Sequence, residues 1–219
     1  MAACTNNKAR IEEEKLRQDS IRMANEARVR DSLATLELQK ENQRMEISKT
    51  AFGGARFEMG AKEVLETEVF RGGTSGADWV QPRGGSSPVG RYQYGVRAKF
   101  HHDSLYMITF TSGSENAAYI EDKILSYATN FKEVIAEKYG PPQKNNGAPD
   151  VMDFNPGSIR WIYEWDIEDK VIQIGMAEES SGSHYYAVSR IYYKPIFQKL
   201  FDAKGNRKQD SVIRDATKF

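Results

Sequence analysis

The sequence predicts an α+β protein: a long charged helix, then one compact domain with an antiparallel sheet and helices packed on one face. Residues 8–48 contain no Gly, Pro or aromatic residue, residues 115–139 have a helical apolar period, and three alternating strands follow residue 158. No strand–helix–strand succession requires parallel pairing. We therefore divide the chain into a helical region at residues 1–50, a domain at 51–201 and a polar tail at 202–219.

The helical region is rich in good helix formers, and opposite charges interleave along it. Glu13 with Arg17, and Glu26 with Arg30, have the i,i+4 spacing that stabilises a helix surface. Its apolar stripe is thin and consists of Leu16, Met23, Val29, Leu33 and Leu36. Such a stripe cannot bury a helix in a core. We expect a solvated spacer, or one strand of a weak coiled coil through which the chain self-associates.

The first part of the domain alternates short elements with glycine-rich turns. We expect a strand at residues 52–57, a turn at Gly60 and a short helix at residues 61–70. The Gly, Ser and Pro density of residues 71–90 predicts a loop. The runs RYQYGVRAKF and LYMITFTS flank HHDS, which is typical of a β-hairpin.

The strongest helix signal lies at residues 115–139. One apolar face is formed by Ile120, Ile124, Ala128, Phe131 and Ile135. Ser114 is the expected N-cap, and Gly140 followed by Pro141 predicts the C-terminal end. This face should pack on the sheet.

Three strands, IRWIYEWDI, KVIQIGMAE and YYAVSRIYYK, are separated by short turns and predict a meander. Strict alternation would place Ile159, Trp161, Tyr163 and Trp165 on one face of the first strand. Pro195 is expected to open a last short helix.

Composition excludes several function classes. Lys plus Arg and Asp plus Glu both total 31, so the formal net charge is zero and a nucleic-acid partner is not expected. No run approaches 18 apolar residues, and the single cysteine, Cys4, cannot form an intramolecular disulfide.

No motif predicts catalysis, a cofactor or a metal. His101, His102 and Asp103 are consecutive in a predicted turn, where neighbouring side chains point apart, and His184 lies near another turn. The GGTSG string lacks the Gly-Lys-Ser/Thr ending of a phosphate loop. The carboxylate pairs Glu178 with Glu179, and Asp166 with Glu168, are interpreted as solvated turn residues. We expect no enzyme.

The aromatic residues are the candidate partner-binding residues, namely Trp79, Trp161, Trp165 and Tyr186. Those on the strands either form core against the helix face of Ile124 and Phe131, or form an exposed platform for a sugar or peptide. Trp79 lies in a glycine-rich polar segment, where it either plugs the edge of the domain or anchors a partner.

The residues AAC before and at Cys4 resemble the end of a bacterial lipobox, although Met1 occupies the leucine-like position. The charged run after it is similar to the helices that follow the lipid cysteine in lipoproteins of Bacteroidetes bacteria. This resemblance covers the first 50 residues. It implies lipid attachment at Cys4 and a membrane-anchored protein. Because acidic residues begin only at Glu12, it implies retention on the periplasmic side of the outer membrane.

The domain also resembles small periplasmic two-layer domains in its FEMG-AKEV start and YGPP helix end, with Ala61 in place of the usual serine or threonine. Similar domains occur in outer-membrane assembly lipoproteins and β-lactamase-inhibitor-like proteins. The resemblance implies a non-enzymatic accessory subunit that docks a protein partner in the envelope. The alternatives are a carbohydrate- or peptide-binding module that uses the aromatic face and the Trp79 segment, a hydrolase whose site carries no recognised motif, and a cytoplasmic coiled-coil protein.

Overall fold

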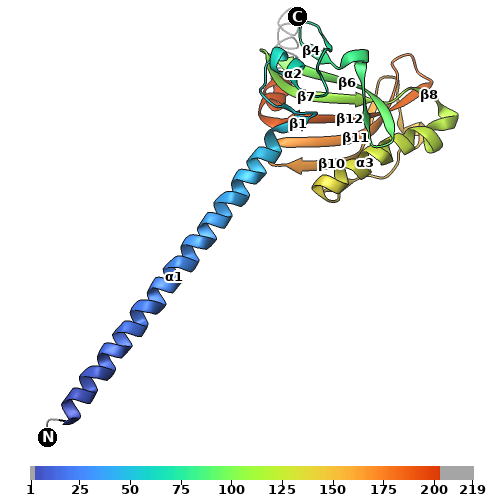
Figure 1. Cartoon of the computed structure of the whole chain (residues 1–219). Coiled ribbons are helices and arrows are strands. Elements are labelled where there is room, and N and C mark those ends of the chain that lie inside the picture. Colours follow the sequence, from blue (N-terminus) through green and yellow to red (C-terminus); the bar gives the residue numbers. More distant parts are fainter. Residues whose placement is uncertain (1–2, 203–219) are drawn as a thin grey trace, which may run out of the picture. The chain divides into compact units, whose positions relative to one another are not determined.

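The computed structural model of the chain describes the backbone of residues 3–202 and the side chains of residues 14–202. Its residues form two compact units with a boundary between Glu46 and Ile47. Helix α1 (Ala3–Lys49) is continuous over 47 residues (Figure 1), which confirms the predicted long helix. Its large apolar side chains between Leu16 and Ile47 are exposed and form no single apolar face. None of the helices in the described part of the chain has the length and apolar composition that a bilayer crossing needs.

The second unit is built on an antiparallel sheet of ten strands with the order β3-β4-β6-β7-β12-β11-β10-β9, in which β5 also pairs with β6 and β8 with β12. Figure 1 shows the central strands of this order, from β4 to β10. Its members are β3 (Thr74–Ser75), β4 (Trp79–Gln81), β5 (Ser86–Val89), β6 (Tyr92–His101), β7 (Ser104–Thr111), β8 (Glu115–Asn116), β9 (Lys144–Asn145), β10 (Ile159–Ile167), β11 (Lys170–Glu178) and β12 (His184–Tyr193). The predicted α+β class, the hairpin and the meander are all confirmed.

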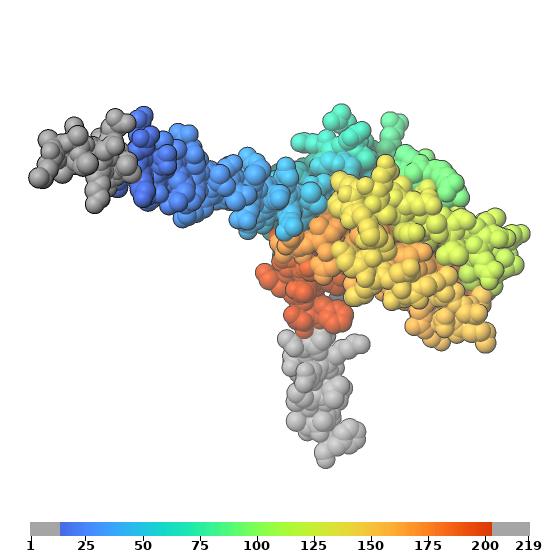
Figure 2. Space-filling view, turned by 90° about the horizontal axis from the view of Figure 1, so that it is seen from below, coloured from blue at the N-terminus to red at the C-terminus, as the bar shows by residue number. Residues whose placement is uncertain are grey.

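Helix α3 (Leu125–Tyr139) packs on one face of this sheet and appears yellow on the surface in Figure 2. The predicted apolar face is buried, since Ile120, Ile124, Ala128, Phe131 and Ile135 are all at most 8% exposed. The Phe131 ring lies edge-on to Tyr94 and Phe110, with centroids 5.2 and 4.9 Å away. The hydrophobic core therefore lies between α3 and the sheet.

The start of this helical region differs from the prediction. Residues 115–116 form β8, and a 3₁₀ turn (Ala117–Tyr119) and a π turn (Ile120–Ile124) precede α3. Ser114 is not the N-cap, because the Asn116 side chain accepts the hydrogen bond from the Ala118 N–H at 3.0 Å. Gly140 ends the helix as predicted, with a φ of 78° that suits glycine.

The hairpin turn between β6 and β7 caps the neighbouring helix. His102 and Asp103 both have positive φ, as a two-residue type I′ turn requires. The Asp103 carboxylate accepts a hydrogen bond from the Ala61 N–H at 3.0 Å, at the start of α2 (Ala61–Glu66). Gly60 stands at the N-cap position without a side chain, so Asp103 supplies the cap from 42 residues away.

Three predictions for residues 50–90 were wrong. The helix expected at 61–70 is shorter, because α2 ends at Glu66. The expected strand at 52–57 is two short strands, β1 (Thr50–Phe52) and β2 (Ala55–Arg56), because Gly53 and Gly54 adopt positive φ between them. The expected loop at 71–90 contains β3, β4, the 3₁₀ turn Arg83–Gly85 and β5. Backbone pairing with β6 outweighs the glycine and proline content there.

A β-bulge in β10 overturns the expected single aromatic face. Trp161 pairs with Gly175, but Tyr163 pairs with Ile174, so two residues of β10 advance against one of β11. A Cβ at Gly175 would lie 2.2 Å from the Arg160 carbonyl oxygen, so this tight site requires glycine. Ile159 and Trp161 consequently face away from α3, whereas Tyr163 and Trp165 face it.

Lys170 is fully buried in the second unit and holds the segment that begins with Ile47. Its ammonium donates hydrogen bonds to the carbonyls of Ile47 and Thr50 and to the Tyr139 hydroxyl, at 2.6, 3.2 and 3.0 Å. Burial lowers the pKa of Lys170 from its ordinary value, and the bond to Tyr139 opposes that shift. Residues from Ile47 onward thus belong to the domain.

Candidate binding face

The sheet face opposite α3, called here the open face, carries a polar row across six strands. Cross-strand pairing aligns Arg97 with Thr109, Thr109 with Arg190, Arg190 with Gln173, Gln173 with Glu164, and Glu164 with Lys144. Paired residues share a face of a sheet, so these six side chains form one line from β6 to β9.

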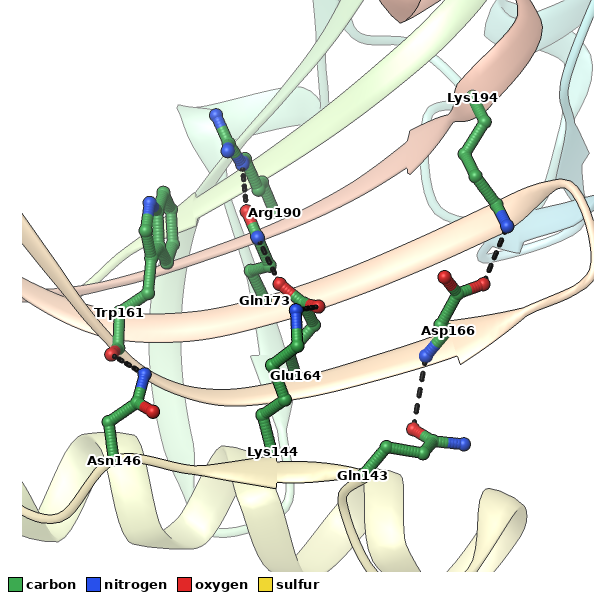
Figure 3. Close-up of polar contacts among 9 residues, drawn as sticks. All are labelled: Gln143, Lys144, Asn146, Trp161, Glu164, Asp166, Gln173, Arg190 and Lys194. Carbon is green, nitrogen blue, oxygen red and sulfur yellow. Dashed lines mark hydrogen bonds and ion pairs between the residues drawn. The ribbon is translucent and has the colours of Figure 1, made fainter.

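Hydrogen bonds connect one half of this polar row, as Figure 3 shows. Arg190 Nε donates to Gln173 Oε1 at 2.7 Å, and Gln173 Nε2 donates to Glu164 Oε2 at 2.5 Å. Lys144 Nζ forms an ion pair with the other oxygen of Glu164. Both oxygens of the Glu164 carboxylate therefore have a partner. Gln173 bridges Glu164 and Arg190, because its amide nitrogen donates to Glu164 and its amide oxygen accepts from Arg190.

Glu164 and Arg190, the two charged residues that Gln173 connects, both have shifted pKa values. Desolvation raises the pKa of Glu164, but hydrogen bonds from Lys144 and Gln173 and the charges of Lys144 and Arg190 outweigh it, so the pKa lies below its usual value. Burial lowers the pKa of Arg190 from its ordinary value. A guanidinium remains charged in proteins, so Arg190 brings a positive charge to a partly desolvated position.

Aromatic rings surround the Arg190 guanidinium. Its carbon lies 4.4 Å from the centroid of Trp161 and 5.1 Å from those of Tyr192 and Phe197. These are cation–π distances, and they fix the plane of the guanidinium. Among the described residues, no group accepts a hydrogen bond from either Nη atom of Arg190. The two Nη atoms, each with two N–H groups, are thus held in place without an acceptor among the described residues.

A second arginine–tryptophan pair lies toward the other edge. The Arg97 guanidinium carbon lies 5.0 Å from the centroid of the Trp79 ring. Beside it is a hollow of about 300 Å³ lined by Gln81, Gly85, Gly95, Val96, Arg97, Lys99, Thr109 and Thr111. Hydroxyl, amide and cationic groups dominate this lining, as a site for a polar ligand requires.

The charges on the open face are unequally compensated. Glu164 is paired with Lys144, and Asp166 is paired with Lys194 at 2.6 Å. None of the ion pairs found among residues 14–202 includes Arg97, Lys99 or Arg190. The part of the open face formed by β6, β7 and β12 is therefore positively charged, although the chain as a whole is neutral.

The structure separates the four predicted aromatic residues. Trp79 and Trp161 are half-buried on the open face, and Tyr186 lies on that face at β12, four residues before Arg190. Trp165 is fully buried, and its indole N–H donates to the Gly140 carbonyl at 2.9 Å. The prediction of Trp165 as a partner-binding residue was wrong, because the bulge turns it into the core.

Sequence reasoning missed the polar residues of this face, above all Arg97, Gln173 and Arg190. The available signal was a charged or amide residue at alternating positions in apolar strands, as in KVIQIGM and YAVSRIY. The prediction for Cys4 falls outside the residues whose side chains are described.

The histidines and acidic pairs do not converge on a reaction centre. Among the described residues, no group of three His, Cys, Asp or Glu side chains could hold a metal ion. Glu178 is buried, contrary to the solvated-turn interpretation, and accepts hydrogen bonds from the Ser183 N–H and the Tyr185 hydroxyl. Its oxygen is thereby occupied in holding the turn before β12.

Comparison of the chain with models of protein families, with curated proteins and with solved structures finds no match.

Proposed function

We propose that this chain is a non-enzymatic accessory protein of the bacterial cell envelope that docks a protein partner on the open face. The observation that carries the proposal is the Arg190 guanidinium, oriented by Gln173 and three aromatic rings while both Nη atoms lack an acceptor among the described residues. Desolvating a cation is costly, and the nearby carboxylate of Glu164 is bonded to Gln173 and Lys144 rather than to the guanidinium. Such an arrangement is typical of a preorganised binding group, since tryptophan, tyrosine and arginine dominate binding energy at interfaces.

The proposal assigns α1 and Cys4 to attachment. Cys4 would carry the lipid, α1 would act as the spacer, and the protein would face the periplasm from the outer membrane. The exposed apolar side chains of α1 leave self-association through this helix as part of the proposal. Stable anchoring requires two or more acyl chains, because a single chain gives only marginal membrane binding.

The test of attachment uses the full-length gene with its native signal. Cys4→Ala should move the protein from the membrane fraction to the soluble fraction, while its circular dichroism spectrum is unchanged. If wild type and variant are both soluble, the envelope assignment is wrong and a cytoplasmic helical protein is the better explanation.

The test of docking compares partners captured from native membranes by the wild type and by Arg190→Gln. The proposal expects a specific protein to be lost with Arg190→Gln and retained with Arg91→Gln. Arg91 is a suitable control because it pairs with Glu133 at the surface and is not part of the polar row. Equal capture by all three proteins would refute docking through Arg190.

A second candidate function is binding of a carbohydrate. Trp161 also lines a hollow of about 490 Å³ with Asn146, Asp153 and Arg160, and a tryptophan beside amide and carboxylate groups suits a sugar ring. In this case Trp161→Ala would abolish binding to a glycan array, whereas Arg97→Gln would leave it unchanged.

A further inference from the structure

We propose that the open face binds an acidic segment of its protein partner, whose carboxylates are received by Arg97 and Arg190 on either side of Thr109. This inference rests on the proposed docking function and names the chemistry of the partner.

The geometry of the polar row defines two cationic positions. Arg97 and Arg190 pair with the same residue, Thr109, from opposite sides, so they are separated by two strand spacings, or about 10 Å. Each guanidinium lies over a tryptophan, Arg97 over Trp79 and Arg190 over Trp161. Alternate residues of an extended peptide lie about 7 Å apart on the same side. Two acidic side chains of such a peptide can therefore reach the two guanidinium groups.

The charge on this part of the face selects an anion. Lys99 pairs with Met107 in the row next to Arg97, so it adds a third cation to the hollow beside β6. Two carboxylates of the open face, Glu164 and Asp166, are each already paired with a lysine. A carboxylate arriving from a partner would therefore meet three cations that have no ion pair among residues 14–202.

A carboxylate from the partner would also accept hydrogen bonds from the donors that are free on this face. Arg190 uses Nε for Gln173, which leaves its two Nη atoms to donate to one anion. The lining of the hollow adds the hydroxyl of Thr111 and the amide of Gln81. The Thr109 hydroxyl is already used, since it donates to the Arg97 carbonyl at 3.3 Å. A protein segment is favoured over a small free anion because the two cationic positions lie apart on a broad face rather than around one point.

The experiment titrates the purified wild-type chain with acetylated, amidated tetraglutamate and follows the arginine Nε–H and tryptophan Nε1–H signals by ¹⁵N NMR. The inference expects shifts at Arg97, Arg190, Trp79 and Trp161. It also expects weakening in high salt and binding about tenfold weaker in Arg190→Gln. Tetraglutamine should cause no shift. Arg91→Gln should bind as the wild type does.

The variant Arg97→Gln should leave the domain folded for a physical reason: Arg97 is exposed, and its sheet pairing and its bond from Thr109 use backbone atoms that the substitution keeps. It should also weaken tetraglutamate binding. Shifts with inorganic phosphate but not with tetraglutamate, or no shift with either, would overturn the inference. If tetraglutamate fails while Arg190→Gln still loses the captured partner, the acidic ligand is wrong and the docking function stands.

Discussion

Because of the bulge in β10, Trp161 and Trp165 lie on opposite faces of the same strand. The same substitution, Trp→Phe, can therefore be compared at an open-face position and at a core position. Trp165→Phe removes the indole N–H that donates to Gly140 and leaves a gap in a fully buried site. An unsatisfied carbonyl costs about 1–3 kcal/mol, and the lost apolar contact adds about 1 kcal/mol or more. The expected loss in the free energy of unfolding is therefore about 2–4 kcal/mol.

Trp161→Phe should cost less than about 1 kcal/mol, because Trp161 is half-buried and a phenyl ring still presents a face to Arg190. Urea unfolding followed by circular dichroism measures both values, and thermal midpoints should fall by roughly 4–16 °C for Trp165→Phe only. If Trp161→Phe costs as much as Trp165→Phe, both rings lie in the core and the assignment of faces is wrong.

Three further predictions concern stability. Asp103→Ala should lower the free energy of unfolding by about 0.5–2 kcal/mol and Asp103→Asn by less, since Asp103 caps α2; equal losses in urea unfolding would contradict the capping role. Burial raises the pKa of Tyr94 to about 12, so the stability it contributes is complete below pH 10 and is lost as the pH rises toward 12. The stability gap between wild type and Tyr94→Phe should narrow over that range, and a constant gap would contradict it. Deleting residues 1–40 should lower the thermal midpoint of the domain by less than about 10 °C, and a larger fall would mean that α1 stabilises it.

Periodicity predicted the parts of the fold in which local and tertiary preferences agree. The spacing of Ile124, Phe131 and Ile135 identified the buried face of α3, and Gly140 marked its end. The alternation in β11 and β12 identified the meander. These features depend on the burial of one face of a helix or strand, and the spacing of apolar residues in the sequence indicates that face directly.

Pairing between distant segments was not predictable in the same way. Trp79 and Val80 form a strand because Lys99 and Ala98 pair with them, not because their own segment favours one. The bulge at Trp161 shifts the pattern by one residue, and such a shift moves every later side chain to the other face.

The candidate site was only partly predicted for the same reason. Trp79 and Trp161 were identified as isolated aromatic residues, but their contacts with Arg97 and Arg190 depend on the pairing of β4 with β6 and of β10, β11 and β12. The cap from Asp103 to Ala61 likewise joins residues 42 positions apart. Long-range contacts of this kind leave no local spacing in the sequence.

The most direct test of docking through the open face is photo-crosslinking in intact cells. A photoreactive amino acid in place of Thr111 lies on the open face and lines the hollow beside Arg97. The same amino acid in place of Glu137, an exposed residue of α3, provides the control on the opposite side of the sheet. Docking on the open face predicts a discrete crosslinked protein from position 111 that disappears with Arg190→Gln and is not obtained from position 137. The same product from both positions, or from position 137 alone, would contradict it.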